Sequence, residues 1–186
     1  MLQIIRRAST GTKALVAIFV ASLISHAAVA AEQQTINAFA IWEGQGVIYE
    51  TGVNMGTFVG SIAGRFFIET DRGPLDAGRI VCPVMLDMNL LNARQNGRGK
   101  CTITAEDGAQ VFGDWSCHGV HLIGCDGEMT LTGGTGRLAG TSGSGEIRIR
   151  STVRGVAKTA STKGSAMEFA RGILLLDRFT YTIPSQ

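Results

Sequence analysis

The segment that decides the fold is Thr132–Gly145, which reads TGGTGRLAGTSGSG. A run so rich in glycine resembles a phosphate-binding loop, but its glycines miss the G-x-G-x-x-G spacing and no helix pattern follows. The next residues, Glu146–Arg150, read EIRIR and alternate polar with apolar side chains. Alternation with this period is typical of a half-buried strand. The segment therefore predicts a connection between two strands and argues against a nucleotide site.

Strand patterns recur along the remaining chain, and no segment after residue 31 keeps a helical period over three turns. About eight strands joined by hairpins can form a closed barrel or a two-layer sandwich. We expect an all-β fold, an eight-stranded antiparallel barrel, because closure removes exposed strand edges. The expected strands are Ile36–Tyr49, Met55–Thr70, Arg79–Asp87, Lys100–Ala105, Gln110–Ser116, Gly127–Thr132, Glu146–Arg154 and Arg171–Ile183.

Three segments carry more specific expectations. Pro83 cannot donate a backbone hydrogen bond, so its strand is expected to be bulged or to lie at an edge. Gly155–Gly164 is small and polar and predicts a mobile loop. Ser165–Ala170 fits either one helical turn or the start of the last strand.

The first thirty residues have the layout of a secretory signal peptide. Arg6, Arg7 and Lys13 precede an apolar run from Ala14 to Ile24, and small residues end at Ala30. We expect cleavage after Ala30, which leaves one domain over residues 31–186 and no stable membrane anchor. The expected location is the periplasm or the medium outside the cell.

Removal of that segment changes the charge balance of the chain. The segment holds three of the seventeen basic residues and none of the fifteen acids, so the mature chain has a formal net charge of −1. A near-neutral surface provides no electrostatic footprint for nucleic acid and no polybasic patch for anionic lipid. No nucleic-acid partner is expected.

The mature part contains four cysteines, and export to an oxidising compartment predicts two disulfides among three possible pairings. If Arg79–Asp87 pairs with Gly97–Ala105, Cys82 lies opposite Cys101. Cys117 and Cys125 then close a small loop that holds His118 and His121. Zinc is the alternative for this loop, but the two histidines have opposite parity in an extended chain and the spacing fits no zinc finger. No metal and no cofactor are expected.

Aromatic and acidic residues within strands are the candidates for a site inside the barrel. Trp42, Phe66 and Trp115 are expected to point inward, and Glu43 lies next to Trp42. An inward carboxylate would have a raised pKa and could carry a proton, whereas simple alternation places Glu43 in solvent. No Gly-x-Ser-x-Gly motif and no Ser, His and Asp arrangement stands out, so no catalytic residue is assigned.

The run Met129–Gly140 entering the strand at Glu146 resembles the turn between late barrel strands of the allene oxide cyclase and dirigent superfamily. Gly99–Cys125 is similar to small exported bacterial proteins with this barrel. The resemblance implies an eight-stranded barrel, often oligomeric, whose lumen can hold an apolar or aromatic molecule. Leu138 stands where an aromatic residue is usual, and the acidic site residues of the family have no match here. A turn motif reports on fold and not on chemistry.

Three functional readings follow. The first is a non-enzymatic exported barrel that binds a small hydrophobic molecule or an envelope partner. The second is an isomerase or cyclase acting on an apolar substrate, with Glu43 as proton carrier; whether the protein is an enzyme stays open. The third is a secreted inhibitor that uses an exposed, rigid loop 117–125, with His121 as a contact residue.

Overall fold

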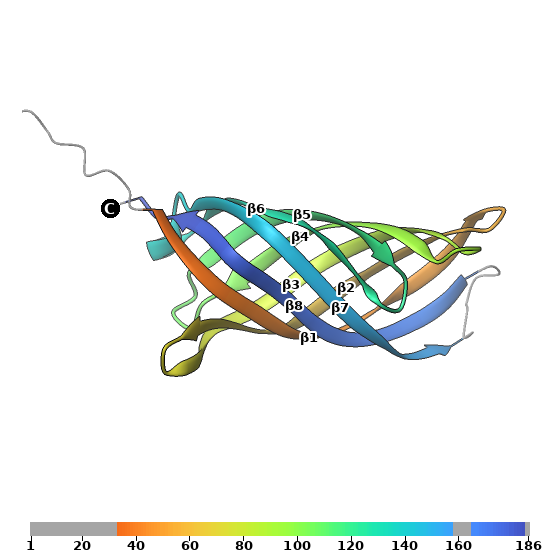
Figure 1. Cartoon of the computed structure of the whole chain (residues 1–186), viewed down its shortest axis with the longest axis horizontal. Coiled ribbons are helices and arrows are strands. Elements are labelled where there is room, and N and C mark those ends of the chain that lie inside the picture. The colour runs from red at the N-terminus through yellow and green to blue at the C-terminus, as the bar shows by residue number, and fades with distance from the viewer. Residues whose placement is uncertain (1–32, 158–164, 185–186) are drawn as a thin grey trace, which may run out of the picture.

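A computed structural model describes residues 33–157 and 165–184, without the side chains of 153–157, as one closed barrel of eight antiparallel strands (Figure 1). This confirms the predicted fold class. The predicted signal peptide lies outside the described residues. Within them, the one helical element is the short 3-10 turn η1, and no helix is long and apolar enough to span a membrane. The strands are β1 (Gln33–Gly52), β2 (Met55–Thr70), β3 (Gly73–Asn89), β4 (Arg94–Thr104), β5 (Gln110–Val120), β6 (Gly124–Gly134), β7 (Ser142–Ala157) and β8 (Ser165–Thr182), with η1 (Gly136–Leu138) between β6 and β7.

The strands follow one another in chain order, and β1 closes the barrel by pairing with β8. The barrel is elongated, and its strands run obliquely to the long axis (Figure 1). One end, called the terminal end below, holds the start of β1, the end of β8 and the connections 71–72, 105–109 and 135–141. The other, called the far end, holds the turns 53–54, 90–93 and 121–123.

Glycines on the inner face make room for large aromatic side chains. A Cβ atom on Gly172 would lie 2.6 Å from Cζ2 of Trp42, and one on Gly99 would lie 2.7 Å from Nε1 of Trp115. Distances this short are not tolerated between packed atoms. The interior therefore fills with tryptophan at mid-barrel because the facing wall positions have no side chain. Trp42, Phe66 and Trp115 are all buried, as predicted.

The two disulfides pair as hairpin symmetry predicted, Cys82 with Cys101 and Cys117 with Cys125. Val81 pairs with Thr102 and Val84 pairs with Gly99, so Cys82 faces Cys101 directly across β3 and β4. Cys117 and Cys125 instead lie diagonally across the β5–β6 hairpin. All four cysteines are buried in the barrel interior.

Two local expectations are corrected by the pairing of the strands. Pro83 lies opposite Ser61 in a strand with partners on both sides, so β3 is no edge; its bulge is at Ala77, between the pairs of Phe66 and Phe67. Barrel closure supplies partners on both sides wherever the proline falls. Gly155 belongs to β7 rather than to a loop, while 158–164 lie outside the described residues. Of the two alternatives for Ser165–Ala170, the structure has the start of β8, paired with β1.

Candidate functional site

A cavity of about 490 Å³ lies at the terminal end of the barrel. Seven of the eight strands contribute apolar side chains to it, and Phe66 and Met129 form its buried floor toward mid-barrel. Charged side chains lie only at its rim, near the connections. The apolar lining residues are Ile36, Phe66, Ile68, Leu75, Ala77, Ile103, Ala105, Val111, Met129, Leu131, Leu138, Leu176, Phe179 and Ile183.

The glycine-rich connection forms part of the cavity wall. Its 3-10 turn η1 is closed by hydrogen bonds from the Leu138 amide to Thr135 O (3.1 Å) and from the Ala139 amide to Gly136 O (3.0 Å). Gly136 has φ +58°, a left-handed conformation in which glycine is favoured. The turn brings the half-buried Leu138 side chain against the cavity. The segment that first resembled a phosphate loop thus contributes an aliphatic wall.

Ion pairs tie the rim of the cavity together. Arg137 Nε donates to Asp107 Oδ2 at 2.5 Å and so links the glycine-rich connection to the β4–β5 turn. This hydrogen bond is the main cause that lowers the pKa of Asp107, assisted by the Ala109 amide. Arg65 pairs with Asp76 in the same way, and its hydrogen bond lowers the pKa of the Asp76 carboxyl. Both aspartates are therefore held as anions at the mouth of an apolar space.

The predicted interior aromatics divide between two spaces. Phe66 lines the terminal cavity, whereas Trp42 and Trp115 line a second, smaller space of about 60 Å³ nearer the far end. A volume of that size holds about two water molecules. The mid-barrel between them is packed, so the lumen is open at one end and nearly filled at the other.

Glu43 does not point into the barrel, which corrects the proton-carrier hypothesis. Its neighbour Trp42 occupies the inward position, so Glu43 is exposed on the outer face, opposite Arg171 of β8. Alternation along a strand sends adjacent side chains to opposite faces. The isomerase reading loses the acid on which it depended.

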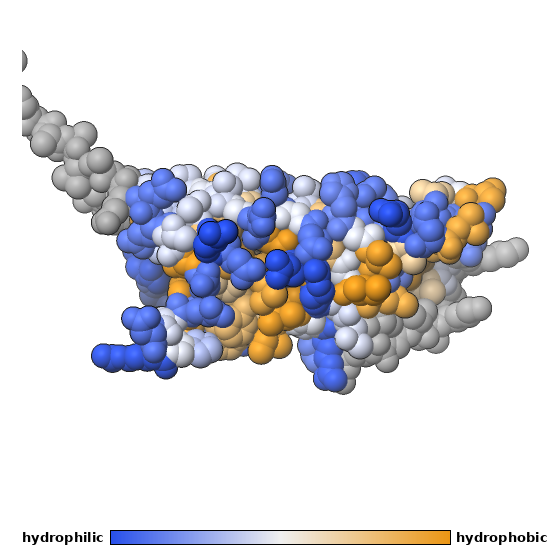
Figure 2. All heavy atoms as spheres, viewed as in Figure 1, coloured by the Kyte–Doolittle hydropathy of each residue, from blue (hydrophilic) through white to orange (hydrophobic). Residues whose placement is uncertain are grey.

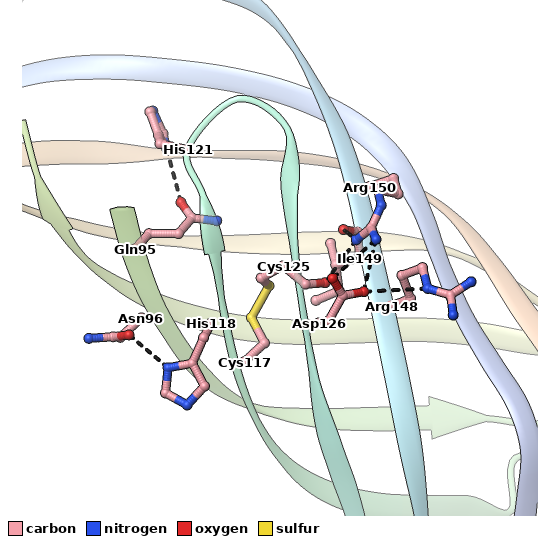
Figure 3. Close-up of a disulfide and its surroundings, with 10 residues drawn as sticks. All are labelled: Gln95, Asn96, Cys117, His118, His121, Cys125, Asp126, Arg148, Ile149 and Arg150. Atoms are coloured by element: carbon pink, nitrogen blue, oxygen red, sulfur yellow. Dashed lines mark hydrogen bonds and ion pairs between the residues drawn. A yellow bond between two sulfur atoms is a disulfide. The ribbon is translucent and has the colours of Figure 1, made fainter. Parts of the chain in front are cut away.

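A buried acid does exist, but at a residue that sequence reasoning missed. Glu168 of β8 is 5% exposed, and its Oε2 lies 3.0 Å from Nε2 of His121. His121 Nδ1 lies 3.2 Å from Oε1 of Gln95, which is also buried (Figure 3). Glu168 shares the parity of Gly172 and Leu174, so extending the last strand upstream would have placed it inside.

The loop 117–125 presents different residues from those expected. His121 turns toward Gln95 and Glu168, with 17% of its side chain exposed, whereas His118 points to the outer face and lies 2.8 Å from Asn96 Oδ1 (Figure 3). The exposed residues of the tip are Leu122 and Ile123. The cysteine sulfurs that a zinc site would need are bonded to each other.

No protein-family model matches this sequence, and the comparison with curated proteins also finds no match. Among solved structures, the chain is similar to the pterocarpan synthase dirigent protein GePTS1 at 12% sequence identity and a TM-score of 0.31. That similarity covers 80% of this chain and 93% of the other. Scores this low carry no functional inference, so membership of the dirigent superfamily stays a prediction.

Proposed function

We propose that the protein is a non-enzymatic, exported barrel that binds a small hydrophobic molecule in the terminal cavity. The observation that supports this proposal is the cavity itself, about 490 Å³ with almost entirely apolar walls. Ligand pockets are typically about 300–1,000 Å³ and mostly apolar, with a few placed polar groups. The cavity has both properties.

The arrangement of the lining suggests how a ligand would lie. An apolar body would contact Phe66, Leu131 and Phe179 in the interior, which removes hydrocarbon surface from water. Any polar group on the ligand would point outward to the rim, where Glu106 and the Arg137–Asp107 pair provide acceptors and donors. The expected ligand class is therefore a compact hydrophobic or aromatic molecule with at most one polar end.

The two disulfides favour an oxidising compartment as the place where the protein works. Together with the predicted signal peptide, they support the periplasm or the extracellular medium. In either place, a protein with an apolar cavity could hold a molecule that is poorly soluble in water.

Fluorescence of N-phenyl-1-naphthylamine, a neutral apolar probe, tests this proposal. The wild-type protein should bind the probe, and Leu131→Trp should weaken binding about tenfold by filling the cavity. Ile41→Trp is the matched control, because Ile41 is 58% exposed on the outer face of β1. Circular dichroism would establish that both variants fold. Absence of probe binding by the wild type, or equal binding by a folded Leu131→Trp variant, would refute the proposal.

Native mass spectrometry of protein purified from its own host would then identify the molecule. A bound mass that is present in the wild type and absent in Leu131→Trp would assign that molecule to the terminal cavity. A bound mass that persists in the variant would place the ligand elsewhere.

A further inference from the structure

Three buried polar side-chain atoms have no hydrogen-bond partner within the described residues: Trp42 Nε1, Trp115 Nε1 and Glu168 Oε2. Other hydrophilic side chains are spread over the outer face, where water pairs with them (Figure 2). Buried polar atoms without partners are uncommon in proteins, and a bound molecule is one of their recognised causes. All three residues line the second, smaller space of about 60 Å³, called the far-end space below. The unpaired atoms therefore gather around one enclosed volume.

The two indole rings beside this space are held in place by the barrel wall. Trp42 is 4% exposed and Trp115 is 6% exposed. Each ring lies against a glycine of the neighbouring strand, Gly172 for Trp42 and Gly99 for Trp115, where a Cβ atom would collide with it. Side chains packed in this way lose little conformational freedom when a ligand binds, which favours binding. The two N–H groups are thus preorganised donors.

The far-end space also has other polar groups in its lining. Gln95, His121 and Ser151 contribute to it, and His121 lies between Gln95 and Glu168 (Figure 3). Of all the residues that line the space, only Leu122 is exposed. A buried water molecule needs two to four polar partners and a volume of at least one water. The far-end space meets both requirements.

The donors and acceptors around the space select the chemistry of its ligand. An indole N–H only donates, whereas a carboxyl oxygen accepts. An anion only accepts, so it would pair with Trp42 and Trp115 but would lie against the carboxyl group of Glu168. An ammonium ion only donates, so it would leave both indole N–H groups unpaired. A hydroxyl group accepts and donates, and it can satisfy all three residues.

We propose that the far-end space is a second binding site, which takes small hydroxylic molecules. Their oxygens accept hydrogen bonds from the Trp42 and Trp115 indole N–H groups, and their O–H groups donate to Glu168 Oε2. The volume suits about two water molecules or one short alcohol. No residue lines both this space and the terminal cavity. The barrel therefore has two separate sites of different chemistry, one for hydrocarbon and one for hydroxyl groups.

Nuclear magnetic resonance of the indole groups tests this inference. The chain has two tryptophans, so a ¹⁵N spectrum contains two indole N–H signals, and Trp42→Phe assigns them. Both signals should show nuclear Overhauser contacts to water, with the sign that a long-lived bound molecule produces. Added ethanol should shift both signals and replace these contacts if the site takes an alcohol. If the water contacts persist in ethanol, the hydroxylic ligand is water.

Ala170→Leu provides a variant in which the space is filled. Ala170 of β8 lines the far-end space, whereas the half-buried Ala166 of the same strand does not, so Ala166→Leu is the matched control. Oxygen-17 relaxation of the solvent counts long-lived water molecules. Ala170→Leu should lose about two of them, and Ala166→Leu should keep them. Circular dichroism would establish that both variants fold. Probe binding in the terminal cavity should be unchanged in both, so failure here is distinct from failure of the proposed function.

Three results would overturn the inference. One is the absence of contacts between water and both indole N–H groups in the wild type. Another is a folded Ala170→Leu variant that keeps as many long-lived water molecules as Ala166→Leu. The third is that dissolved xenon, an apolar probe, shifts the indole signals while ethanol does not. Xenon enters dry apolar cavities, so that result would mean that the polar groups do not select the ligand.

Discussion

His121 Nε2 lies 3.0 Å from Glu168 Oε2 and connects the β5–β6 turn to β8 across the far end of the barrel. Glu168 Oε2 is buried and accepts no aligned hydrogen bond from the described residues, so His121 Nε2 is the polar atom that lies against it. A buried carboxylate is costly without a partner of opposite charge or a hydrogen-bond donor. His121 therefore provides the polar contact that offsets the cost of burying Glu168.

Replacing His121 with alanine should destabilise the protein strongly. His121→Ala leaves the Glu168 carboxyl group buried without its polar neighbour, and a buried polar group left unsatisfied costs about 1–3 kcal/mol. The double variant His121→Leu with Glu168→Leu removes both polar groups and should be closer to the wild type. Urea unfolding measures both. Equal stability of His121→Ala and the wild type would show that the pair contributes nothing.

The two disulfides should differ in their contribution to stability. Cys82 and Cys101 are 19 residues apart in sequence, whereas Cys117 and Cys125 are 8 apart. In the chain-entropy model, closing the longer loop contributes about 3.3 kcal/mol and closing the shorter about 2.6 kcal/mol. Paired replacement of each bridge by serine, followed by urea unfolding, tests this order. The reverse order would mean that native packing around the sulfurs outweighs loop entropy.

An alanine at Gly46 should be poorly tolerated. Its Cβ would collide with the ring of Phe58 and the carbonyl of Val59, and overpacking of a core costs about 1–3 kcal/mol. Gly52→Ala in the same strand is the control, because its nearest atom, Met55 Cβ, would be 3.6 Å away. We expect a lower melting temperature for Gly46→Ala and no loss for Gly52→Ala. Similar melting temperatures would contradict the packing of Phe58 over Gly46.

The Arg137–Asp107 pair at the rim of the terminal cavity should stabilise the protein less in acid. The Arg137 hydrogen bond lowers the pKa of Asp107 in the folded protein. Stability from this pair is therefore fully present above the unfolded pKa, about 3.9, and is lost as the pH falls through the lower folded value. Arg137→Gln should be less stable than the wild type at neutral pH, and the difference should shrink below about pH 4.

Urea midpoints over a pH series measure this effect. Arg94→Gln is the control, because Arg94 is exposed and makes no ion pair within the described residues. The difference in urea midpoint between Arg94→Gln and the wild type should not change with pH in this range. If the difference in urea midpoint between Arg137→Gln and the wild type were also constant with pH, the Asp107 pair would not contribute to the pH dependence of stability.

Much of the fold follows from local sequence patterns. Alternation after the glycine run, at Glu146–Arg150, predicted a strand and excluded a nucleotide site. Hairpin turn signals placed the cysteines closely enough to predict both disulfides. The same alternation placed Trp42 and Trp115 inside, because a one-residue shift would have put them in water.

The buried polar cluster was not predicted, because its residues come together only when the barrel closes. Gln95, His121 and Glu168 lie on β4, the β5–β6 turn and β8, and their spacing in sequence contains no signal of contact. The choice between inward and outward Glu43 stayed open until the structure placed Trp42 in the interior and Glu43 on the outer face. The division of the lumen into an open end and a packed middle depends on which glycines face which aromatics.

The sequence alone determined the all-β class and the strand alternation, because each rests on neighbours in the chain. It favoured one of three cysteine pairings, and the structure has that pairing. Only the tertiary structure decided where charged and aliphatic side chains cluster on the barrel. Antiparallel closure brings every second connection to the same end, so the aliphatic turns at Val53, Leu91 and Ile123 meet at one end and the charged rim of the cavity forms at the other.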